Sequence, residues 1–493
     1  MEQDFLLLLP VFFPMAAGIF VAVLSGTKAG RRGRRLFVAA SLILEIVFTA
    51  LCLAGEGRSL VLWRLTEELQ IYFQVDGMSR IFASLSVFMW LLAGIFAFRY
   101  MDHEEREDRF FGCYLAVEGA LAGLSFAGNL ISFYLFFEMM TFTSLFLVFH
   151  EGGRAAILAG LKYLFYSVAG AFMALFGIFF LAGFGGLGYF APGGILDGAS
   201  LSGHTGLILA SAFLLVVGFG AKAGMFPLHG WLPTAHPEAP APASAVLSGV
   251  ITKMGVLGII RAVYYVVGVE LLRGTWVQTA WIILALITIF MGSMLAYREK
   301  GLKKRLAYST VSQVSYILFG LALMERTAFV GAMLHVAVHS LVKNSLFLGA
   351  GAIIFQTGKK RVSELAAVGK EMPVTLWCFA FASLALIGIP PAGGFVSKWY
   401  LAEGALASGT GAFTWLGPVV LLVSALLTAG YLLPIVIHGF FPGTDYDYGS
   451  LKKREPSLLM TIPVAFLAAG ALVLGMFPGV VVNAVTRAAG GIF

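Results

Sequence analysis

Apolar runs of about 20 residues follow one another along the sequence, separated by short polar segments. This is the length that an α-helix needs to cross the hydrocarbon core of a bilayer. The fourth and fifth runs are separated only by the weak break Ala127-Gly128-Asn129. We count fourteen runs, at residues 5–24, 36–54, 78–98, 110–128, 130–149, 157–184, 206–231, 241–267, 275–296, 306–324, 329–355, 373–402, 412–439 and 457–481. The pattern predicts an all-α polytopic membrane protein with fourteen transmembrane helices.

The composition agrees with a membrane protein and excludes several soluble classes. Of the 493 residues, 59% are hydrophobic and 12% are charged, whereas a soluble domain carries about 25% charged residues. The mean hydropathy is +0.90. A cytosolic enzyme, a nucleic-acid-binding protein or a disordered chain of this length needs far more polar surface. Cys52, Cys113 and Cys378 lie in apolar runs without metal-ligand spacing, so we expect them to be packing residues and expect no bound metal.

Basic residues are distributed unevenly between alternate loops. One set of loops holds Lys28, Arg31, Arg32, Arg34, Arg35, Arg99, Arg106, Arg109, Arg154, Arg298, Lys300, Lys303, Lys304, Arg305, Lys359, Lys360, Arg361, Lys370, Lys452, Lys453 and Arg454. The other set holds only Arg58, Arg64, Arg273, Arg326 and Arg487. Loops rich in Lys and Arg stay on the cytoplasmic side. We therefore expect a multi-pass protein of the cell (inner) membrane with both termini on the outer face.

The remaining basic residues fall inside the predicted spans. Arg80, Lys162 and Arg261 lie toward helix ends, where long side chains reach the headgroups. The deeper ones are Lys222, Lys253, Lys343 and Lys398. A lysine at the bilayer centre costs about 2.5–3.5 kcal/mol on insertion scales. Loss of water favours the neutral amine, so a buried lysine can gain and lose a proton near neutral pH, as a proton relay requires.

Acidic residues accompany these lysines inside the apolar runs. Glu138 lies in the middle of the fifth run, and Glu118 lies in the fourth. Glu45 lies in the second run, which holds no other buried charge, so we expect local pairing or a subunit contact for it. Ionisable residues within membrane spans usually mark ion or proton routes.

One predicted helix carries a stripe of ionisable residues. His335, His339 and Lys343 are spaced i, i+4, i+8 and therefore lie on one face. Two histidines one turn apart also suit zinc, but the glutamate of an H-E-x-x-H motif is absent. In a membrane helix, such a stripe more often faces a hydrated interior.

Two of the runs contain glycines and prolines next to a deep lysine. The seventh reads GAKAGMFPLHGWLP and places Pro227 and Pro233 after Lys222. The twelfth reads GIPPAGGFVSK and places Pro390 and Pro391 before its own lysine. Proline removes a helix hydrogen bond, and the freed backbone is tolerated only where protein or water covers it. Two unrelated proline kinks would give the same pattern, but the shared lysine favours two broken helices in two related halves.

Four stretches in these runs resemble the antiporter-like subunits of respiratory complex I, Mrp-type Na⁺/H⁺ antiporters and membrane-bound hydrogenases. The most specific, AKAGMFPLHGWLPTAHPEAPAPASAVLSGVITKMG, combines two deep lysines with the family's PxHxWLPxAHxxAP turn. The others are FFEMMTFTSLFLV around Glu138, LHVAVHSLVKNSLFLGAG around Lys343 and PPAGGFVSKW around Lys398. The chain ends soon after the fourteenth run, without the long lateral helix of the largest complex I member. In length and motifs it is therefore most similar to the Mrp D-type subunit.

The resemblance implies a fold of two inverted five-helix repeats with broken helices 7 and 12. The expected parts are 1–109 with peripheral helices 1–3, 110–270 with helices 4–8, 271–440 with helices 9–13, and 441–493 with helix 14.

The resemblance also implies a proton relay at mid-membrane. Glu138 matches the glutamate that pairs with the lysine of the broken seventh helix, here Lys222. Lys253 matches the connecting residue of the eighth helix. The implied central and terminal members are His335, His339, Lys343 and Lys398. We add Glu118, His229 and His236 as supporting residues.

These features predict a proton-translocating subunit of a multisubunit ion-pumping complex, coupled to Na⁺ exchange or to redox chemistry in partner subunits. We expect other membrane subunits, the lipid bilayer, H⁺ and, in an Mrp system, Na⁺ as partners, with no nucleic acid and no cofactor. No catalytic site is expected in this chain, although the host can be an NADH:quinone oxidoreductase-like or hydrogenase complex. The alternatives are a stand-alone carrier of a small solute, which needs a central cavity, and a redox enzyme, which needs a GxGxxG motif, a Cys cluster or a haem pair.

Overall fold

The structure is a computed structural model that describes residues 4–23, 30–55, 57–66, 69–196, 203–443, 446, 449 and 451–493. Lys28 of the predicted basic loops lies outside the described residues.

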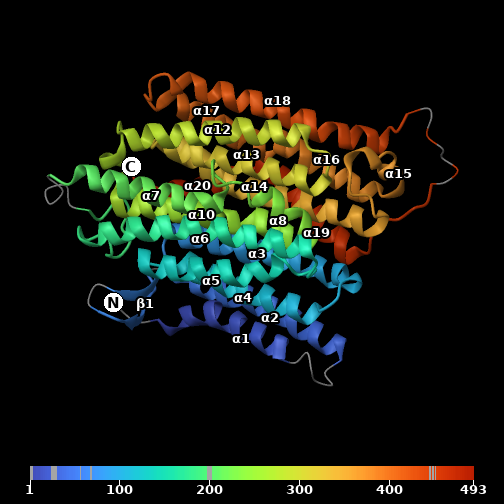
Figure 1. Ribbon diagram of the computed structural model, residues 1–493, viewed down its shortest axis with the longest axis horizontal. Coiled ribbons are helices and arrows are strands. Elements are labelled where there is room, and N and C mark those ends of the chain that lie inside the picture. Colours follow the sequence, from blue (N-terminus) through green and yellow to red (C-terminus); the bar gives the residue numbers. More distant parts are fainter. Residues whose placement is uncertain are drawn as a thin grey trace.

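Helices make up almost all of the described chain (Figure 1). Their bounds are α1 Leu9–Val23, α2 Arg31–Ala54, α3 Gly77–Tyr100, α4 Glu107–Phe126, α5 Leu130–Val148, α6 Arg154–Ala182, α7 Thr205–Ala223, α8 Leu232–Glu238, α9 Ala241–Val246, α10 Thr252–Ile260, α11 Val269–Leu272, α12 Trp276–Arg298, α13 Leu302–Ala322, α14 Arg326–Thr357, α15 Val368–Glu371, α16 Pro373–Ile387, α17 Gly393–Ala407, α18 Phe413–Phe440, α19 Leu458–Met476 and α20 Gly479–Ala488. Short 3₁₀ or π-helical turns lie at Phe5–Leu8, Met101–His103, Leu247–Ile251, Arg261–Val267 and Val362–Glu364.

The described residues include 11 helices long and apolar enough to cross a membrane. Three predicted spans do not meet that description. Two of them, α4 and α13, have charged residues in their first turn and further polar residues along their length. The third, the twelfth run, is divided into α16 and α17 of 15 residues each. The protein is therefore a predominantly helical multi-pass membrane protein, as the apolar pattern predicts.

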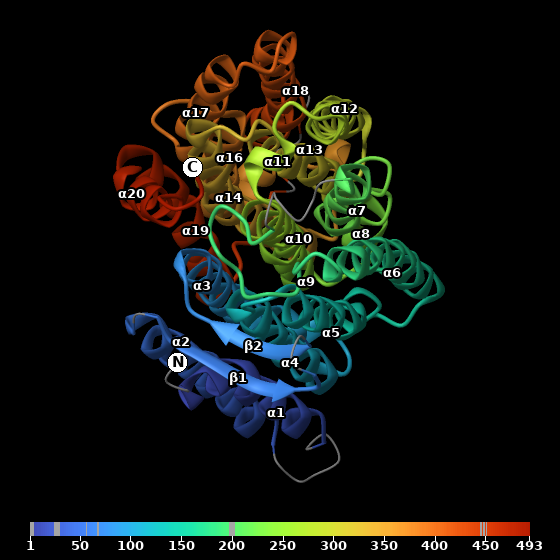
Figure 2. The same cartoon turned by 90° about the vertical axis from the view of Figure 1, so that its left-hand side faces the viewer.

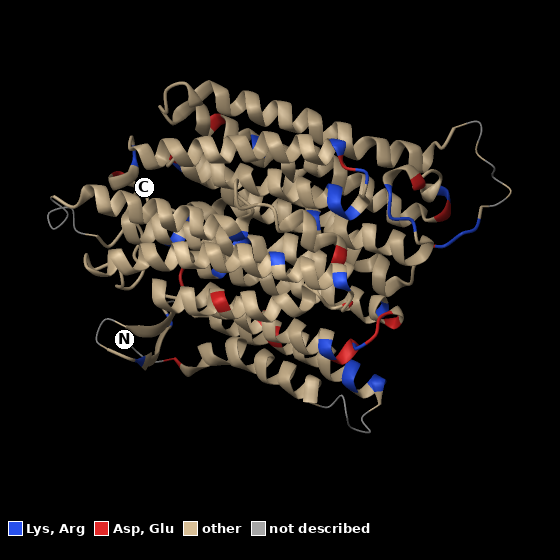
Figure 3. Cartoon of the chain, in the orientation of Figure 1, with Lys and Arg blue, Asp and Glu red and all other residues tan. Residues whose placement is uncertain are grey.

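The two ends of the helix bundle differ in charge. Figure 1 places both termini at its left-hand end, and Figure 3 shows Lys and Arg gathered mainly toward the right-hand end. We call these the terminal end and the basic end. Figure 3 also shows isolated Lys and Arg positions in the middle of the bundle, away from both ends. The distribution agrees with the charge alternation predicted for the loops.

The weak break between the fourth and fifth runs is a helix boundary. α4 ends at Phe126, and the side chain of Asn129 caps α5 by accepting a hydrogen bond from the Ser132 N–H at 2.8 Å. A cap of this kind satisfies one of the free N–H groups at a helix start. The Gly128 N–H donates to the Tyr72 carbonyl at 2.9 Å and is also satisfied.

Both predicted helix breaks are present. α7 ends at Ala223 because Gly224 adopts φ +81°, and the chain continues irregularly to α8. α16 ends at Ile387 because Gly388 adopts φ +94°, and α17 begins five residues later at Gly393. Glycine adopts this left-handed conformation without the steric cost that a side chain adds, so it ends helices readily.

A β-hairpin at the terminal end was not predicted. β1 (Ser59–Arg64) pairs antiparallel with β2 (Gln70–Gln74) between α2 and α3, beneath α4 and α5 in Figure 2. The segments are short and hold few charges, so they resemble the ends of the neighbouring apolar runs. The backbone N–H of Tyr72 donates to the Ser132 hydroxyl at 2.7 Å, which joins the hairpin to α5.

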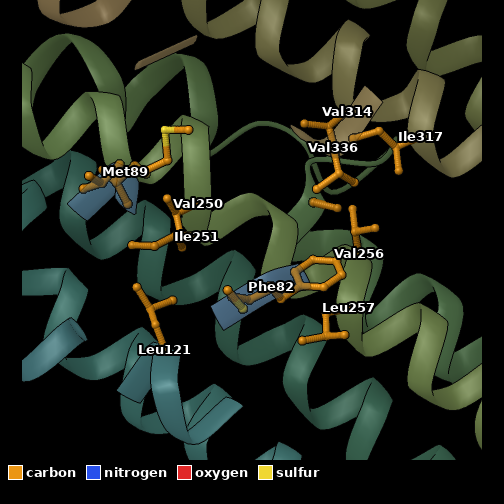
Figure 4. Packing of buried hydrophobic residues seen from close by; sticks show 14 of the residues in the cluster. Phe82, Met89, Leu121, Val250, Ile251, Val256, Leu257, Val314, Ile317 and Val336 are labelled. Atoms are coloured by element: carbon orange, nitrogen blue, oxygen red, sulfur yellow. The ribbon is translucent and has the colours of Figure 1, made fainter. Parts of the chain in front are cut away.

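The centre of the bundle is formed by α14 and by the segment Ala241–Val267. That segment is fully buried, and α14 is buried over most of its length. A helix that is apolar on all sides belongs in the interior of a large bundle. Figure 4 shows Met89 of α3 and Leu121 of α4 near Val250 and Ile251 of this segment. Phe179 of the peripheral α6 is instead 72% exposed, which suits contact with lipid.

Candidate functional site

Lys222 is the second-last residue of α7, directly before the first break, and is buried. Its Nζ donates to the Tyr163 hydroxyl at 2.8 Å and to the Ser167 hydroxyl at 3.0 Å, both on α6. It also lies 4.3 Å from the centre of the Tyr163 ring, within cation–π range. Tyr163 is in turn 2.6 Å from the hydroxyl of Ser144 on α5. Hydroxyl groups therefore surround this amine.

Glu138 faces this region from α5 and is partly exposed. Its charge interacts with that of Lys222, but among the described residues the two form no ion pair. The pair is therefore separated in this structure, with Tyr163 and Ser167 as the direct partners of the amine. The resemblance to the family implied a pair between Glu138 and Lys222 and gave no sign of these intervening hydroxyls.

Lys253 lies in α10 at the centre of the bundle and is completely buried. Its Nζ lies 2.7 Å from Nδ1 of His339 on α14. It also donates to the carbonyl of Ser248, one turn earlier. A buried amine and imidazole in direct contact can share a proton without moving either helix.

The stripe on α14 continues toward the second break. The His335 and His339 ring centres are 5.9 Å apart. Nδ1 of His335 lies 2.9 Å from the hydroxyl of Ser397 on α17. The Nε2 atoms of both histidines are buried without a hydrogen-bond partner among the described residues. Buried polar atoms usually have a protein or water partner, so these atoms mark positions for water.

Lys343 extends the stripe by one further turn. Its Nζ donates to the Ser309 hydroxyl at 2.7 Å and to the Leu306 carbonyl at 3.0 Å, both on α13. The Tyr431 hydroxyl of α18 donates to the same serine at 2.8 Å. Lys343 therefore points to α13 and forms a branch from the row of histidines.

Lys398 lies on α17 directly after the second break. Its Nζ donates to the carbonyls of Leu386 and Ile387, at 2.7 and 2.8 Å, and so caps the broken end of α16. Positive charge near a helix C-terminus is favourable, because the last carbonyls carry partial negative charge. The amine also lies 5.2 Å from the centre of the Tyr316 ring, which stacks on His335.

The supporting histidines occupy different positions around the first break. His229 lies within the break and stacks on Phe226. His236 lies in α8, is completely buried and stacks on Phe347 of α14. Neither ring nitrogen of His236 has a partner among the described residues. Pro227 lies in the break itself, and Pro233 lies at the second residue of α8. Pro390 and Pro391 lie between α16 and α17.

Glu118 does not join this row. It lies on α4 near Glu45 of α2, and the two charges interact. We therefore separate Glu118 from the lysines and histidines of α7, α10, α14 and α17.

The hydroxyl groups around the buried amines and imidazoles were not predicted from the sequence. Tyr163, Ser167 and Ser309 accept from the lysine amines directly. Ser144 and Tyr431 contact two of these hydroxyls, and Ser397 contacts His335. Their only signal in the sequence is a polar residue in an apolar run, which is common in membrane helices. Which of them meet a lysine depends on helices far apart in the sequence.

Titratable groups also gather at the basic end, outside the helices. Burial raises the pKa of the Glu104 carboxyl, and the nearby charge of Glu151 adds to that effect. Burial also lowers the pKa of His150 to about 4, and the positive charge of Arg109 contributes. A cavity of about 370 Å³ is lined here by Glu104, Glu151, Lys303 and others.

Two known family profiles match parts of this chain. Residues 127–428 match the profile described as "NADH:quinone oxidoreductase/Mrp antiporter, TM". Residues 65–111 match "NADH-Ubiquinone oxidoreductase (complex I), chain 5 N-terminus". The first match contains α7, α10, α14 and α17 with all the buried lysines described above.

Two curated relatives cover nearly the whole chain, and a third covers 64% of it. The N-type subunit of the NADH-quinone oxidoreductase of Desulforudis audaxviator is 32% identical, over 96% of this chain and 95% of the relative. The D-type subunit of the Na(+)/H(+) antiporter of Bacillus subtilis is 30% identical, over 93% and 92%. Hydrogenase-4 component B of Escherichia coli is 36% identical, over 64% of this chain and 49% of that protein.

Solved structures share the fold over nearly the full length. A chain of the membrane-bound sulfane sulfur reductase, an archaeal respiratory membrane complex, superposes with a TM-score of 0.85 at 21% identity and covers 99% of this chain and 97% of its own. A chain of the Mrp complex from Dietzia sp. DQ12-45-1b gives 0.83 at 23% identity, with the same coverage. The chain thus belongs to the NADH:quinone oxidoreductase/Mrp antiporter transmembrane family.

Proposed function

We propose that this antiporter-like membrane subunit moves protons along the row Glu138, Lys222, Lys253, His339, His335 and Lys398. The observation that supports this most strongly is the row from Lys253 through His339 and His335 to Ser397, in which hydrogen bonds lie at both ends and the two ring centres are 5.9 Å apart. Water at the unpartnered Nε2 atoms would connect the two rings. Ser397 precedes Lys398 on α17, so the row ends at the second break. Amines, imidazoles and hydroxyls can all accept and donate protons.

The proposed fold consists of fourteen spans. They comprise the eleven long apolar helices, α4, α13 and the divided α16–α17 unit. The first inverted repeat covers 110–270, the second covers 271–440, and 1–109 and 441–493 flank them. The two breaks occupy equivalent places in the two repeats, each beside a lysine. The basic end faces the cytoplasm and both termini face outward, because basic loops stay on the cytoplasmic side.

The switch of the mechanism is the distance between Glu138 and Lys222. At an effective dielectric near 20, a 4 Å carboxylate–amine pair is worth about 4 kcal/mol, or roughly three pKa units. Approach of Glu138 therefore holds the proton on the amine, and separation lets it leave. The structure has the separated arrangement, in which only neutral hydroxyls contact the amine.

Water must bridge the step from Lys222 to Lys253. Among the described residues no hydrogen bond joins them, but their helices touch: a Cβ on Gly255 would lie 3.2 Å from the Cβ of Lys222. α7 and α10 therefore approach closely at this level. The proposal places water between the two amines at this contact.

The proton supply is proposed to lie at the basic end. The amine of Lys303, which lines the cavity there, donates to the carbonyls of Pro237 and Ala239 at 3.2 and 2.5 Å. His236 directly precedes Pro237, and its charge interactions include Lys303, Lys253 and Lys343. It therefore lies between the cavity and the row, with both ring nitrogens available to water.

The host is proposed to be a multisubunit membrane assembly, since the relatives named above are subunits or components of such systems. Coupling is to Na⁺ exchange in an Mrp system or to redox chemistry in partner subunits. The neighbouring genes identify which assembly to purify: small antiporter subunits, nickel and iron–sulfur subunits, or flavin and quinone-module subunits.

The test is proton uptake by proteoliposomes that contain the whole assembly. Lys222→Ala and Glu138→Ala are each expected to reduce coupled proton movement about tenfold or more, since a positioned proton-transfer group contributes at least that much. Glu270→Ala, an exposed residue paired with Arg273, is the control and keeps the wild-type rate. Intact transport in both relay variants would reject the proposal. Transport of a labelled solute by the chain alone would favour a stand-alone carrier instead.

A further inference from the structure

Two buried carboxyl groups lie outside the proton relay. Glu45 of α2 is 1% exposed and Glu118 of α4 is 4% exposed. The Thr49 hydroxyl donates to Oε1 of Glu45 at 3.3 Å, which is a weak contact. Oε2 of Glu45 and both oxygens of Glu118 have no hydrogen-bond partner among the described residues. An isolated buried carboxylate is costly, so such a group either carries a proton or has a cation beside it.

The two carboxyl groups are close enough for their charges to interact, and among the described residues neither forms an ion pair with a basic side chain. Two other titratable groups lie near them. The thiol of Cys52 on α2 interacts electrostatically with Glu45, and the phenol of Tyr114 on α4 interacts with Glu118. α1 has no titratable side chain in Leu9–Val23. Charged groups on the helices packed around the two carboxyl groups interact with other partners. Asp4 pairs with Arg58, Arg31 and Arg35 pair with Asp102 and Glu107, and Arg99 pairs with Asp102. Arg80 donates to the Gly55 carbonyl, and Glu138 interacts with Lys222.

The way α3 packs against α4 places a further buried oxygen, the Ser86 hydroxyl, at the level of Glu118 along the bundle. The Trp90 indole N–H donates to the Tyr114 carbonyl at 3.1 Å, and the Tyr114 hydroxyl donates to the Trp90 carbonyl at 2.6 Å. Ser86 lies one turn before Trp90, and Glu118 lies one turn after Tyr114. Because the helices are antiparallel, these two residues are at the same level on facing sides. The Ser86 hydroxyl is buried, with the residue 6% exposed, and has no partner among the described residues.

The way α2 packs against α3 places Glu45 and Thr49 near the level of Ser86 and Glu118. A Cβ on Gly94 would lie 2.7 Å from Leu42 Cδ1 and 3.5 Å from Tyr114 Cε1. One turn after Leu42 on α2 is Glu45, and the next turn reaches Thr49. Oxygens from α2, α3 and α4 therefore gather in one layer of the bundle.

The neighbouring α1 is a continuous helix that contains a proline. Pro14 lies inside α1, so the carbonyl of Pro10 lacks its usual helix donor. The Pro14 ring lies 3.2 Å from the position of a Cβ on Gly119, next to Glu118 in sequence. Irregular backbone inside a membrane is tolerated where protein or a hydrated site covers it.

We propose that Glu45 and Glu118, with Ser86 and Thr49, form a monovalent-cation site separate from the lysine–histidine row. Like charges this close do not both remain ionised in a buried site. With two protons the pair is neutral. It is neutral again with one proton and one sodium ion, so one Na⁺ enters as one proton leaves to water. Hard cations bind oxygen ligands, which are the ligands gathered here.

The experiment measures sodium binding to the purified full chain in detergent. The melting temperature is recorded in NaCl and in choline chloride at equal ionic strength and pH, and the infrared band of protonated carboxyl groups is followed in parallel. In the wild type, sodium is expected to raise the melting temperature and to reduce the protonated-carboxyl band. A ligand that binds only the folded state stabilises it, which explains the first effect.

The variants assign the effect to these residues. Glu45→Gln and Glu118→Gln keep the side-chain shape and are expected to weaken the apparent sodium affinity about tenfold or more. Ser86→Ala is the milder variant, should either glutamine variant fail to fold, and is expected to weaken it less. Glu138→Gln is the matched control in the relay and keeps the full sodium response.

Two results would overturn the proposal. One is a sodium response that is unchanged in Glu45→Gln and Glu118→Gln. The other is a wild type whose melting temperature and carboxyl band do not differ between NaCl and choline chloride. Neither result would affect the proton relay, because that relay is tested through Lys222 and Glu138.

Discussion

The buried lysines of this protein are held by neutral atoms. Among the described residues, Lys222 contacts hydroxyls, Lys253 contacts an imidazole, and Lys398 contacts carbonyls. A carboxylate at 4 Å would hold an ammonium by about 4 kcal/mol more at an effective dielectric near 20. When an ammonium next to a carboxylate releases its proton, this attraction is lost. Neutral partners satisfy the hydrogen bonds of the amine without adding that cost. This residue-scale feature makes proton transfer at modest cost physically reasonable.

A pH prediction at the residue scale concerns His150, in the turn between α5 and α6. Its pKa in the fold is about 4, because the ring is buried and lies near Arg109; an unperturbed histidine has a pKa of about 6.5. The unfolded chain therefore takes up the proton first as the pH falls. The contribution of the neutral ring to the free energy of unfolding is complete above about pH 6.5 and is lost progressively toward pH 4. At pH 5 the loss amounts to about 2 kcal/mol.

The measurement is the midpoint of denaturant unfolding in detergent between pH 7 and pH 5. His150→Gln is expected to lose less stability over this interval than the wild type, because it removes the titrating ring. His438→Gln, at an exposed position on α18, is the control and keeps the wild-type slope. Equal slopes for the wild type and His150→Gln would contradict the prediction.

At the scale of elements, the two helix breaks determine where the relay residues lie. Each break follows a glycine in the left-handed conformation and lies beside a lysine, Lys222 before the first and Lys398 after the second. The break exposes backbone carbonyls at the level of the lysine, and Lys398 uses two of them. An unbroken helix would use those carbonyls internally and leave the amine without partners.

A prediction at this scale follows for Gly388. A Cβ at this position would lie 3.1 Å from Cδ of Lys398, and the residue has φ +94°. Gly388→Ala is expected to cost about 1 kcal/mol of stability through backbone strain. It also displaces the Lys398 side chain, so coupled proton movement in proteoliposomes falls severalfold.

Gly358→Ala is the matched control. Gly358 ends α14 with φ +73°, but a Cβ there would meet nothing within 4 Å. It shares the backbone strain and leaves the relay untouched, so its transport rate stays at the wild-type level. A similar loss of transport in both variants would show that strain, and not the contact with Lys398, is responsible.

At the scale of the whole molecule, the separation of charge between the two ends defines an orientation. The basic end holds most of the Lys and Arg, and the terminal end holds both termini (Figures 1 and 3). Positive residues are retained on the cytoplasmic side during insertion. The proposed relay lies between these ends, and the proposed proton supply lies at the basic end.

Cysteine labelling tests the orientation. In a background with Cys52, Cys113 and Cys378 replaced by Ala, Glu270→Cys places a thiol at the terminal end and Ser363→Cys places one at the basic end. Both residues are exposed. A membrane-impermeant maleimide applied to intact cells is expected to label Glu270→Cys and to label Ser363→Cys only after permeabilisation. The reverse pattern would invert the proposed topology.

The sequence alone determined the membrane class, the helix boundaries near the breaks and the family. Long apolar runs have few physical solutions other than spanning helices, because every backbone polar group must be satisfied inside the segment. Gly224 and Gly388 marked the breaks because glycine and proline act on the local backbone. The β-hairpin was missed, since two short apolar strands differ little from the ends of helices.

The tertiary structure alone decided which polar atoms meet. The contacts of Lys253 with His339, Lys222 with Tyr163 and His335 with Ser397 join residues 86, 59 and 62 positions apart. The proximity of Glu45 to Glu118 likewise depends on how α2 packs near α4. Periodicity fixes the face of a helix on which a residue lies, but the partner helix is selected by packing over the whole bundle. For that reason the residues of the proposed relay could be named from the sequence, whereas the atoms through which they contact their neighbours could not.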